Sequence, residues 1–261
     1  MDALAIGCLA AAGLVAGDAS EIVVERLGSH SGFDRPWWRC TSCGSAAQGA
    51  ALVPVWRCVA LSKRCSACGS QAAHRWRPLV LAVVCACVLG AFAARLGDDV
   101  ALAPFALLGI ALVAISAVDL ERFLIPNRIV YPTIALVAPL LVVSSAVDNR
   151  WGSLARAAIA GAAAFVGFLA VHVLVPRGMG YGDVRLAGLV GLSTGWLGLG
   201  HAFVAFFEAF VLGAVIGIAV MIATGGGRKT RIPFGPFLAA GAVLSVLWGG
   251  PLAHALFHRG G

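Results

Sequence analysis

Charged side chains are scarce in this chain. Asp, Glu, Lys and Arg make up 12% of its 261 residues, while hydrophobic residues make up 60% and the mean hydropathy is +0.93. An ordinary soluble domain has about a quarter of its residues charged. The composition therefore excludes the common soluble classes and predicts a protein whose surface faces lipid.

The chain contains several long apolar segments. A transmembrane helix needs about 20 mostly apolar residues, and we expect eight such spans. They lie roughly at 3–24, 78–94, 101–118, 129–147, 154–175, 184–199, 202–223 and 234–257. The prediction is an all-α polytopic membrane protein in three parts: a first transmembrane helix (1–24), a small cytoplasmic loop domain (25–77) and a seven-helix core (78–261).

The basic residues predict the orientation, because Lys and Arg are retained on the cytoplasmic side of a membrane. With both termini outside, the cytoplasmic loops hold 15 of the 19 Lys and Arg residues. We therefore expect both termini outside and the loops between alternate spans on the cytoplasmic side of the membrane. The net charge of +7 is then mainly a topology signal, and it gives little support to a nucleic-acid partner.

Two aspartates stand out because an ionisable group at membrane depth indicates function. Asp119 closes the apolar run ALLGIALVAISAVD, and Asp183 follows a glycine-rich turn in MGYGD. Both fall on the predicted cytoplasmic side. Two close carboxyls cannot both ionise cheaply, so they can share a proton and activate water. The pattern predicts a membrane aspartyl protease whose active site lies at the cytoplasmic face.

Other polar and flexible residues are candidates for shaping this site. Gly180 and Gly182 allow a tight turn before Asp183, and Glu208 is an isolated carboxyl in an apolar span. Arg185 either contacts the site or anchors its helix at the membrane interface. A structural role also stays open for the aspartates, since each could cap a neighbouring loop or helix.

Two C-x-x-C pairs lie in the polar segment 25–77, with 21 residues between them. Four thiolates at this spacing can hold one tetrahedral zinc ion, and four Cys ligands leave no open position for chemistry. A structural zinc site is therefore expected, with an iron site or two disulfides as the alternatives. The four expected ligands are Cys40, Cys43, Cys65 and Cys68.

Four motifs in order along the chain resemble the prepilin peptidases, also called type IV leader peptidases. They are the paired C-x-x-C loop, DLERFLIPN at 119–127, GMGYGDVRLAG at 178–188 and PFGPFLA at 233–239. The G-x-G-D turn also occurs in presenilin-like proteases, but those carry a Tyr-Asp helix and a Pro-Ala-Leu motif. Here Val118 precedes Asp119, and the late motif is PFGP.

This resemblance implies that Asp119 and Asp183 are catalytic and that the substrates are prepilin or pseudopilin precursors. In the family, cleavage follows a glycine at the end of a short basic leader. Many members with the cysteine loop also methylate the new N-terminus with S-adenosylmethionine. This chain lacks the usual Gly-Ser-Phe-x-Asn stretch and has HRWRPLV after the second C-x-x-C, so methylation stays open.

Two other classes remain possible from the sequence. A proton-coupled transporter also places carboxyls on glycine-rich broken helices, although usually near the bilayer midplane. A zinc-stabilised membrane scaffold would need the cysteines but not the aspartates. The sequence does not indicate an oligomeric state.

Overall fold

The computed structural model describes residues 3–28, 43–45, 67–68, 77–97, 99–175, 179–224 and 233–257. Within these residues the structure is helical and contains no strand. The helices are α1 (Ala3–Gly28), α3 (Arg77–Leu96), α4 (Leu102–Arg122), α5 (Asn127–Val147), α6 (Trp151–Leu174), α7 (Tyr181–Leu197), α8 (Leu199–Thr224) and α9 (Gly235–Phe257). Each coincides with one of the eight expected apolar runs, which confirms the all-helical class.

The chain divides into two compact units, residues 1–94 and residues 95–261. In the first unit, α1 packs against α3 through small residues. A Cβ atom on Gly13 would lie 2.6 Å from the Ala86 Cα, and one on Gly17 would lie 2.5 Å from the Ala82 Cα. Such close backbone approach is typical of helix pairs in membranes.

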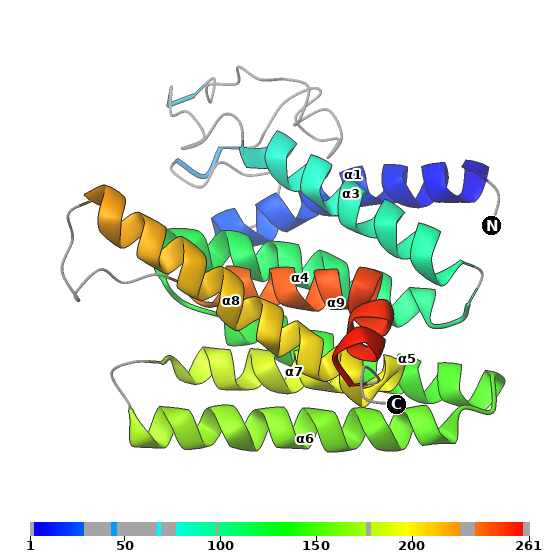
Figure 1. The fold of residues 1–261 in the computed structure, drawn as a ribbon. Coiled ribbons are helices and arrows are strands. Elements are labelled where there is room, and N and C mark those ends of the chain that lie inside the picture. The colour runs from blue at the N-terminus through cyan, green and yellow to red at the C-terminus, as the bar shows by residue number, and fades with distance from the viewer. Residues whose placement is uncertain are drawn as a thin grey trace. The chain divides into compact units, whose positions relative to one another are not determined.

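The second unit holds α4 to α9, and α7 lies among the others. Helix α7 contacts α5, α6, α8 and α9, and α4 contacts α5 and α9. Figure 1 shows α6 and α7 side by side, an arrangement that their extensive contacts confirm. Most side chains of α7 from Val184 to Trp196 are buried, which explains how a helix of only 17 residues is held in this fold.

Small residues also set the contacts of α7 with α6. A Cβ atom on Gly191 would lie 2.7 Å from the Ala160 carbonyl oxygen, and one on Gly195 would lie 2.4 Å from the Ala160 Cβ. The glycines of α7 therefore serve close packing. The same is true between α8 and α9, where a Cβ on Gly241 would lie 2.2 Å from the Ala205 carbonyl oxygen.

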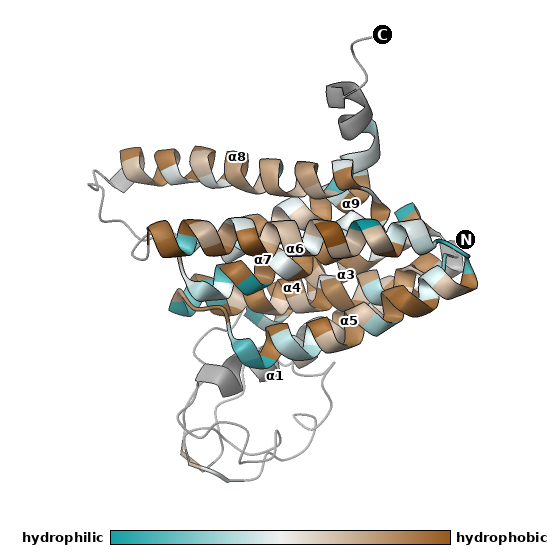
Figure 2. Cartoon of the chain, turned by 90° about the horizontal axis from the view of Figure 1, so that it is seen from below, coloured by the Kyte–Doolittle hydropathy of each residue, from teal (hydrophilic) through white to brown (hydrophobic). Residues whose placement is uncertain are grey.

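Five of the described helices are long and apolar enough to cross a membrane: α3, α4, α5, α6 and α8. Figure 2 shows α8 as hydrophobic along most of its length. Among the five, α4 is the most buried within the protein. The protein is thus a multi-pass membrane protein, while the count of eight spans stays a prediction.

Candidate active site

The two aspartates predicted from the sequence stand on the two helices that are most enclosed by protein. Asp119 lies in the last turn of α4 and is only 4% exposed. Asp183 lies in the first turn of α7 and is partly buried. Each carboxyl accepts a hydrogen bond from a backbone N–H at the start of a helix.

Asp119 is held by the beginning of α9. The Gly235 N–H donates to the Asp119 Oδ2 over 2.9 Å, and the two residues are 116 positions apart. Because Gly235 is the first residue of α9, the carboxyl lies at the N-terminal end of that helix. A local capping role for Asp119 is therefore wrong, since its backbone partner belongs to a distant helix.

The approach of α9 to Asp119 depends on glycine. A Cβ atom at position 235 would lie 2.6 Å from the Asp119 Oδ2 and 3.2 Å from its Cγ. Real Cβ atoms essentially never come within 3.0 Å of another heavy atom in this way. The PFGP motif thus has a physical reason: any larger residue would force the carboxyl or the start of α9 to move.

Asp183 does cap its own helix. Its Oδ2 accepts a hydrogen bond of 3.1 Å from the N–H of Gly180, the N-cap residue of α7. This is one half of a capping box. Helix α7 consequently begins at Tyr181, three residues before the expected span, and includes Asp183 in its first turn. Capping uses one carboxyl oxygen and is compatible with chemistry.

The two carboxyls interact electrostatically. Asp183 lies outside the five helices that are long and apolar enough to cross a membrane. Burial and, second, the charge of Asp119 raise its pKa from 3.8 to about 6, and the hydrogen bond from Gly180 opposes this shift.

The turn between α4 and α5 brings the two helix ends together. Phe123 ends α4 in the left-handed conformation, with φ of 54° and its N–H donating to the Asp119 carbonyl. Ile125 and Pro126 are then buried. A Cβ atom on Gly182 would lie 2.8 Å from the Ile125 Cβ. Gly182 is a helical residue of α7 without a positive φ, so this contact, and not a tight turn, is what requires glycine there.

Arg185 reaches back to the same turn. Its guanidinium donates to the Oδ1 of Asn127, the first residue of α5. It also lies over two rings, 4.2 Å from the centroid of Tyr181 and 5.1 Å from that of Tyr131. The Tyr181 ring in turn lies 5.6 Å from the ring of His172 on α6. Anchoring at the membrane interface, one of the two roles expected for Arg185, does not account for these specific contacts.

Glu208 lies on α8 with its carboxyl partly buried. Its Oε2 atom is enclosed and has no hydrogen-bond partner among the residues that the structure describes. A buried carboxyl oxygen without a partner is costly in a helix, so Glu208 remains a candidate for a site-shaping role.

The cysteine prediction falls largely outside the described residues, since Cys40 and Cys65 are among those not described. Cys43 and Cys68 are exposed, and the Cys43 Sγ lies 3.0 Å from the Ser45 Oγ. The described part of the chain contains no group of three or more potential metal ligands. The zinc site therefore stays a prediction.

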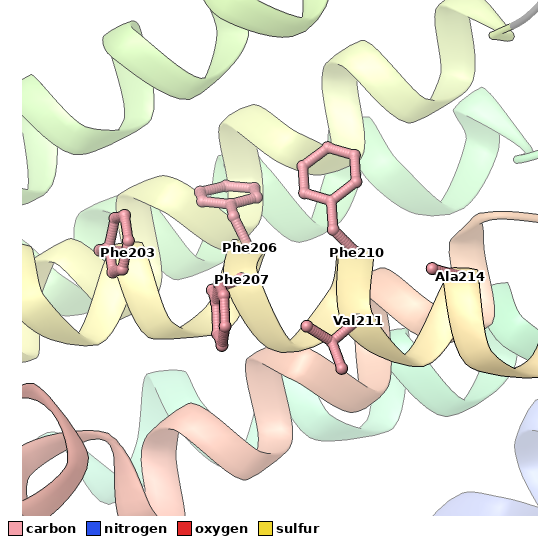
Figure 3. Close-up of a pocket in the computed structure, with 6 residues that line it drawn as sticks. All are labelled: Phe203, Phe206, Phe207, Phe210, Val211 and Ala214. Carbon is pink, nitrogen blue, oxygen red and sulfur yellow. The ribbon is translucent and has the colours of Figure 1, made fainter. Parts of the chain in front are cut away.

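An apolar hollow lies along α8, and no charged side chain lines it. Its lining residues are Phe203, Phe206, Phe207, Phe210, Val211 and Ala214 (Figure 3). At its inner end the Phe210 ring lies 5.4 Å from the ring of Phe234, which directly precedes Gly235. The hollow can accept lipid or an apolar helix, but it has no group that could perform chemistry.

Comparisons with known proteins identify the family of this chain. The Bacterial Peptidase A24 N-terminal domain matches residues 11–95, and the Type IV leader peptidase family matches residues 106–218. A prepilin leader peptidase/N-methyltransferase of Pseudomonas putida is 31% identical over 242 residues, which are 89% of this chain and 80% of that protein. The chain belongs to the type IV leader peptidase family. It is therefore an enzyme of the peptidase class.

Other relatives of the same name support this membership. One from Burkholderia pseudomallei strain K96243 is 35% identical over 226 residues, which are 81% of this chain and 67% of the relative. One from Bacillus subtilis strain 168 is 28% identical over 238 residues, which are 91% of this chain and 92% of the relative. No solved structure matches the chain.

Sequence reasoning left some residues of this leader peptidase site without a role. Gly235 was part of a quoted motif, but nothing in the local pattern indicated that its N–H would meet Asp119. Tyr131, Tyr181 and His172 carried no signal, because isolated aromatic residues are common at membrane interfaces. Asn127 did carry one, namely its fixed position after Pro126 in the motif.

Proposed function

We propose that this chain is a membrane aspartyl endopeptidase that removes the leader peptides of prepilins or pseudopilins, with Asp119 and Asp183 as its catalytic pair. The observation that carries the proposal is the matching environment of the two carboxyls, of which Asp119 is buried and Asp183 partly buried. Each of them receives a backbone N–H from a glycine of a separate sequence motif. Membership of the leader peptidase family supports the substrate class, because the relatives are named for prepilins.

The proposed chemistry requires a single proton shared by the pair. One carboxylate takes a proton from water while the protonated partner donates its proton to the scissile carbonyl oxygen. The resulting gem-diol intermediate collapses when the carboxyl that took the proton from water passes it to the leaving amide nitrogen. A hydroxyl of the intermediate returns its proton to the other carboxyl as the carbonyl re-forms, so the pair again holds one proton. The interaction between Asp119 and Asp183 supports this division of roles, because two like charges held close together disfavour double ionisation.

Four further residues are proposed to shape the site. Gly180 and Gly182 do so through close packing, because a Cβ atom on Gly182 would lie 2.8 Å from the Ile125 Cβ and one on Gly180 would lie 3.3 Å from the Asp183 Oδ2. Arg185 and Glu208 are proposed to shape this site rather than to take part in proton transfer, Arg185 by its contact with Asn127.

The proposed location is the bacterial inner membrane, with both termini outside and the active site at the cytoplasmic face. The concentration of basic residues in the predicted cytoplasmic loops supports this orientation. The pair would then lie where water can enter from the cytoplasm while protein still excludes it from the other side.

A structural zinc ion, held by Cys40, Cys43, Cys65 and Cys68, is proposed for the cytoplasmic loop. The spacing of the cysteines supports it, and metal binding would supply folding energy to a loop with little core. N-methylation with S-adenosylmethionine is a further proposed activity, since the relatives' name includes it. A transporter is not proposed, because the family is one of peptidases.

The proposal is tested by co-expressing the chain with a prepilin that carries a Gly-Phe junction and reading the pilin N-terminus by mass spectrometry. Wild type should remove the leader, and Asp119→Asn and Asp183→Asn should each leave it in place. Added mass of one methyl group on the new N-terminus would demonstrate methylation. Cleavage that persists in either variant would refute the catalytic pair.

A further inference from the structure

The structure ties the helix that carries Asp183 to the turn that follows the helix of Asp119 and to the start of α5. Asn127 begins α5 directly after the turn that leaves α4, and Arg185 lies two residues after Asp183 on α7. The Arg185 guanidinium donates a hydrogen bond to the Asn127 Oδ1. This contact joins residues that are 58 positions apart, of which Asn127 lies eight positions after Asp119 and Arg185 lies two after Asp183.

We propose that Ile125, Asn127 and Arg185 form a positioning bracket that fixes the first turn of α7 against the α4–α5 turn and so sets the position of Asp183 relative to Asp119. The bracket touches no substrate. Its members are positioning residues, and the inference rests on the proposed function.

Two independent contacts make the bracket rigid. On one side, the buried Ile125 side chain packs on the bare backbone of Gly182, where a Cβ atom would come within 2.8 Å. On the other side, Arg185 bonds to Asn127. One contact thus lies before Asp183 and the other after it. Together they prevent the first turn of α7 from sliding or rotating, whereas a single contact would allow one of these movements.

The guanidinium is itself held in place. It lies between the rings of Tyr131 on α5 and Tyr181 on α7, at 5.1 Å and 4.2 Å from their centroids. A planar guanidinium stacks on aromatic faces and donates in a fixed fork. Arg185 therefore connects α5 and α7 through the rings as well as through Asn127, as a residue that only marked the membrane interface would not need to do.

The buried Nε of Arg185 fits this geometry. It has no hydrogen-bond partner among the described residues, although a guanidinium at a membrane surface normally points its donors to water or phosphate. The side chain has thus given up part of its solvation in order to lie between the two rings. That arrangement supports the role of Arg185 as a positioning residue, for which the orientation of the guanidinium matters as well as its charge.

The test compares variants of the full-length enzyme in detergent, with kcat, KM and thermal unfolding measured for each. Asn127→Ala and Arg185→Gln should each lower kcat by about tenfold or more, because small misplacements of catalytic groups have large effects. KM should change little, since the bracket does not contact substrate. Asn127→Asp and Arg185→Lys keep an acceptor and a donor, and each should retain most of the wild-type kcat.

A double variant separates the bracket from unrelated damage. If Asn127 and Arg185 act through each other, the Asn127→Ala/Arg185→Gln variant should be no slower than the slower single variant. Effects on kcat that multiply, or an Asn127→Ala variant with wild-type kcat, would overturn the inference. Failure of the wild type to cleave, or cleavage by Asp119→Asn, would instead overturn the proposed function.

A matched control is available at the other end of the α4–α5 pair. Arg150, just before α6, donates to Asp99 over 2.9 Å and lies over the Trp196 ring at 5.6 Å. It thus also joins a loop to α7 by one polar and one aromatic contact. Arg150→Gln should lower the unfolding temperature while leaving kcat unchanged. An equal loss of kcat in this control would show that any weakened loop contact slows the enzyme and would overturn the bracket.

Discussion

Replacing Gly235 by alanine should separate the position of Asp119 from the stability of the fold. The added Cβ would lie 2.6 Å from the Asp119 Oδ2, whereas ordinary contacts begin at 3.4 Å. Either the carboxyl or the start of α9 must therefore move by about 0.8 Å. The backbone at Gly235 does not have a positive φ, so alanine introduces no conformational strain of its own.

The expected effect on rate follows from this shift. A hydrogen bond of 2.9 Å from the Gly235 N–H is lost when its length passes about 3.5 Å. A hydrogen bond to a charged group contributes about 1.5–3 kcal/mol, and a misplacement of about 1 Å at a reacting group can cost about a hundredfold in rate. We therefore expect kcat of Gly235→Ala to fall by roughly a hundredfold.

The assay is prepilin cleavage by purified enzyme, with thermal unfolding measured on the same samples. Gly167→Ala on α6 is the matched control, since no atom lies within 4 Å of the added Cβ there. That variant should cleave at the wild-type rate and be as stable or slightly more stable. Wild-type kcat in Gly235→Ala would refute the assigned contact between Gly235 and Asp119.

Other predictions concern pH, packing and metal. Burial and the charge of Asp119 raise the pKa of Asp183 to about 6 in the folded protein. As the pH rises from about 4 to about 6, the unfolded chain loses this proton before the folded protein does, so the stability of the wild type should fall over that range. Asp183→Asn should remove that fall, with a gain of at most about 3 kcal/mol near pH 7; equal pH profiles would contradict it. Gly191→Ala, whose Cβ would meet the Ala160 carbonyl at 2.7 Å, should destabilise the protein by about 1–3 kcal/mol in thermal unfolding, and an unchanged unfolding temperature would argue against the α6–α7 contact. Metal analysis should find a single zinc ion per chain in wild type and none in Cys40→Ser, while a wild type without metal would favour the disulfide alternative.

The sequence was sufficient for the class of fold because each helix coincides with an apolar run. Lipid provides no hydrogen bonds, so a long apolar segment has few alternatives to a helix. The ends of helices were less certain. Helix α7 starts at Tyr181 because Asp183 bonds to the Gly180 N–H, and this local polar contact outweighs the hydropathy on which the expected start depended.

The aspartates could be predicted from the sequence, but their surroundings could not. An ionisable residue beside an apolar run is a strong signal wherever its partner lies. In contrast, the contact of Gly235 with Asp119 and that of Arg185 with Asn127 join residues 116 and 58 positions apart. Such pairings depend on which helices become neighbours, and hydropathy and spacing do not determine this.

The central claim, that Asp119 and Asp183 act as one unit, is tested most directly by comparing Asp119→Asn, Asp183→Asn and the double variant in the cleavage assay. Groups that work together in one step lose nearly all of their effect when either is removed. The account predicts that both single variants lose cleavage to the same extent and that the double variant is no slower than either. Unequal losses that multiply in the double variant would contradict it, because the two carboxyls would then act independently.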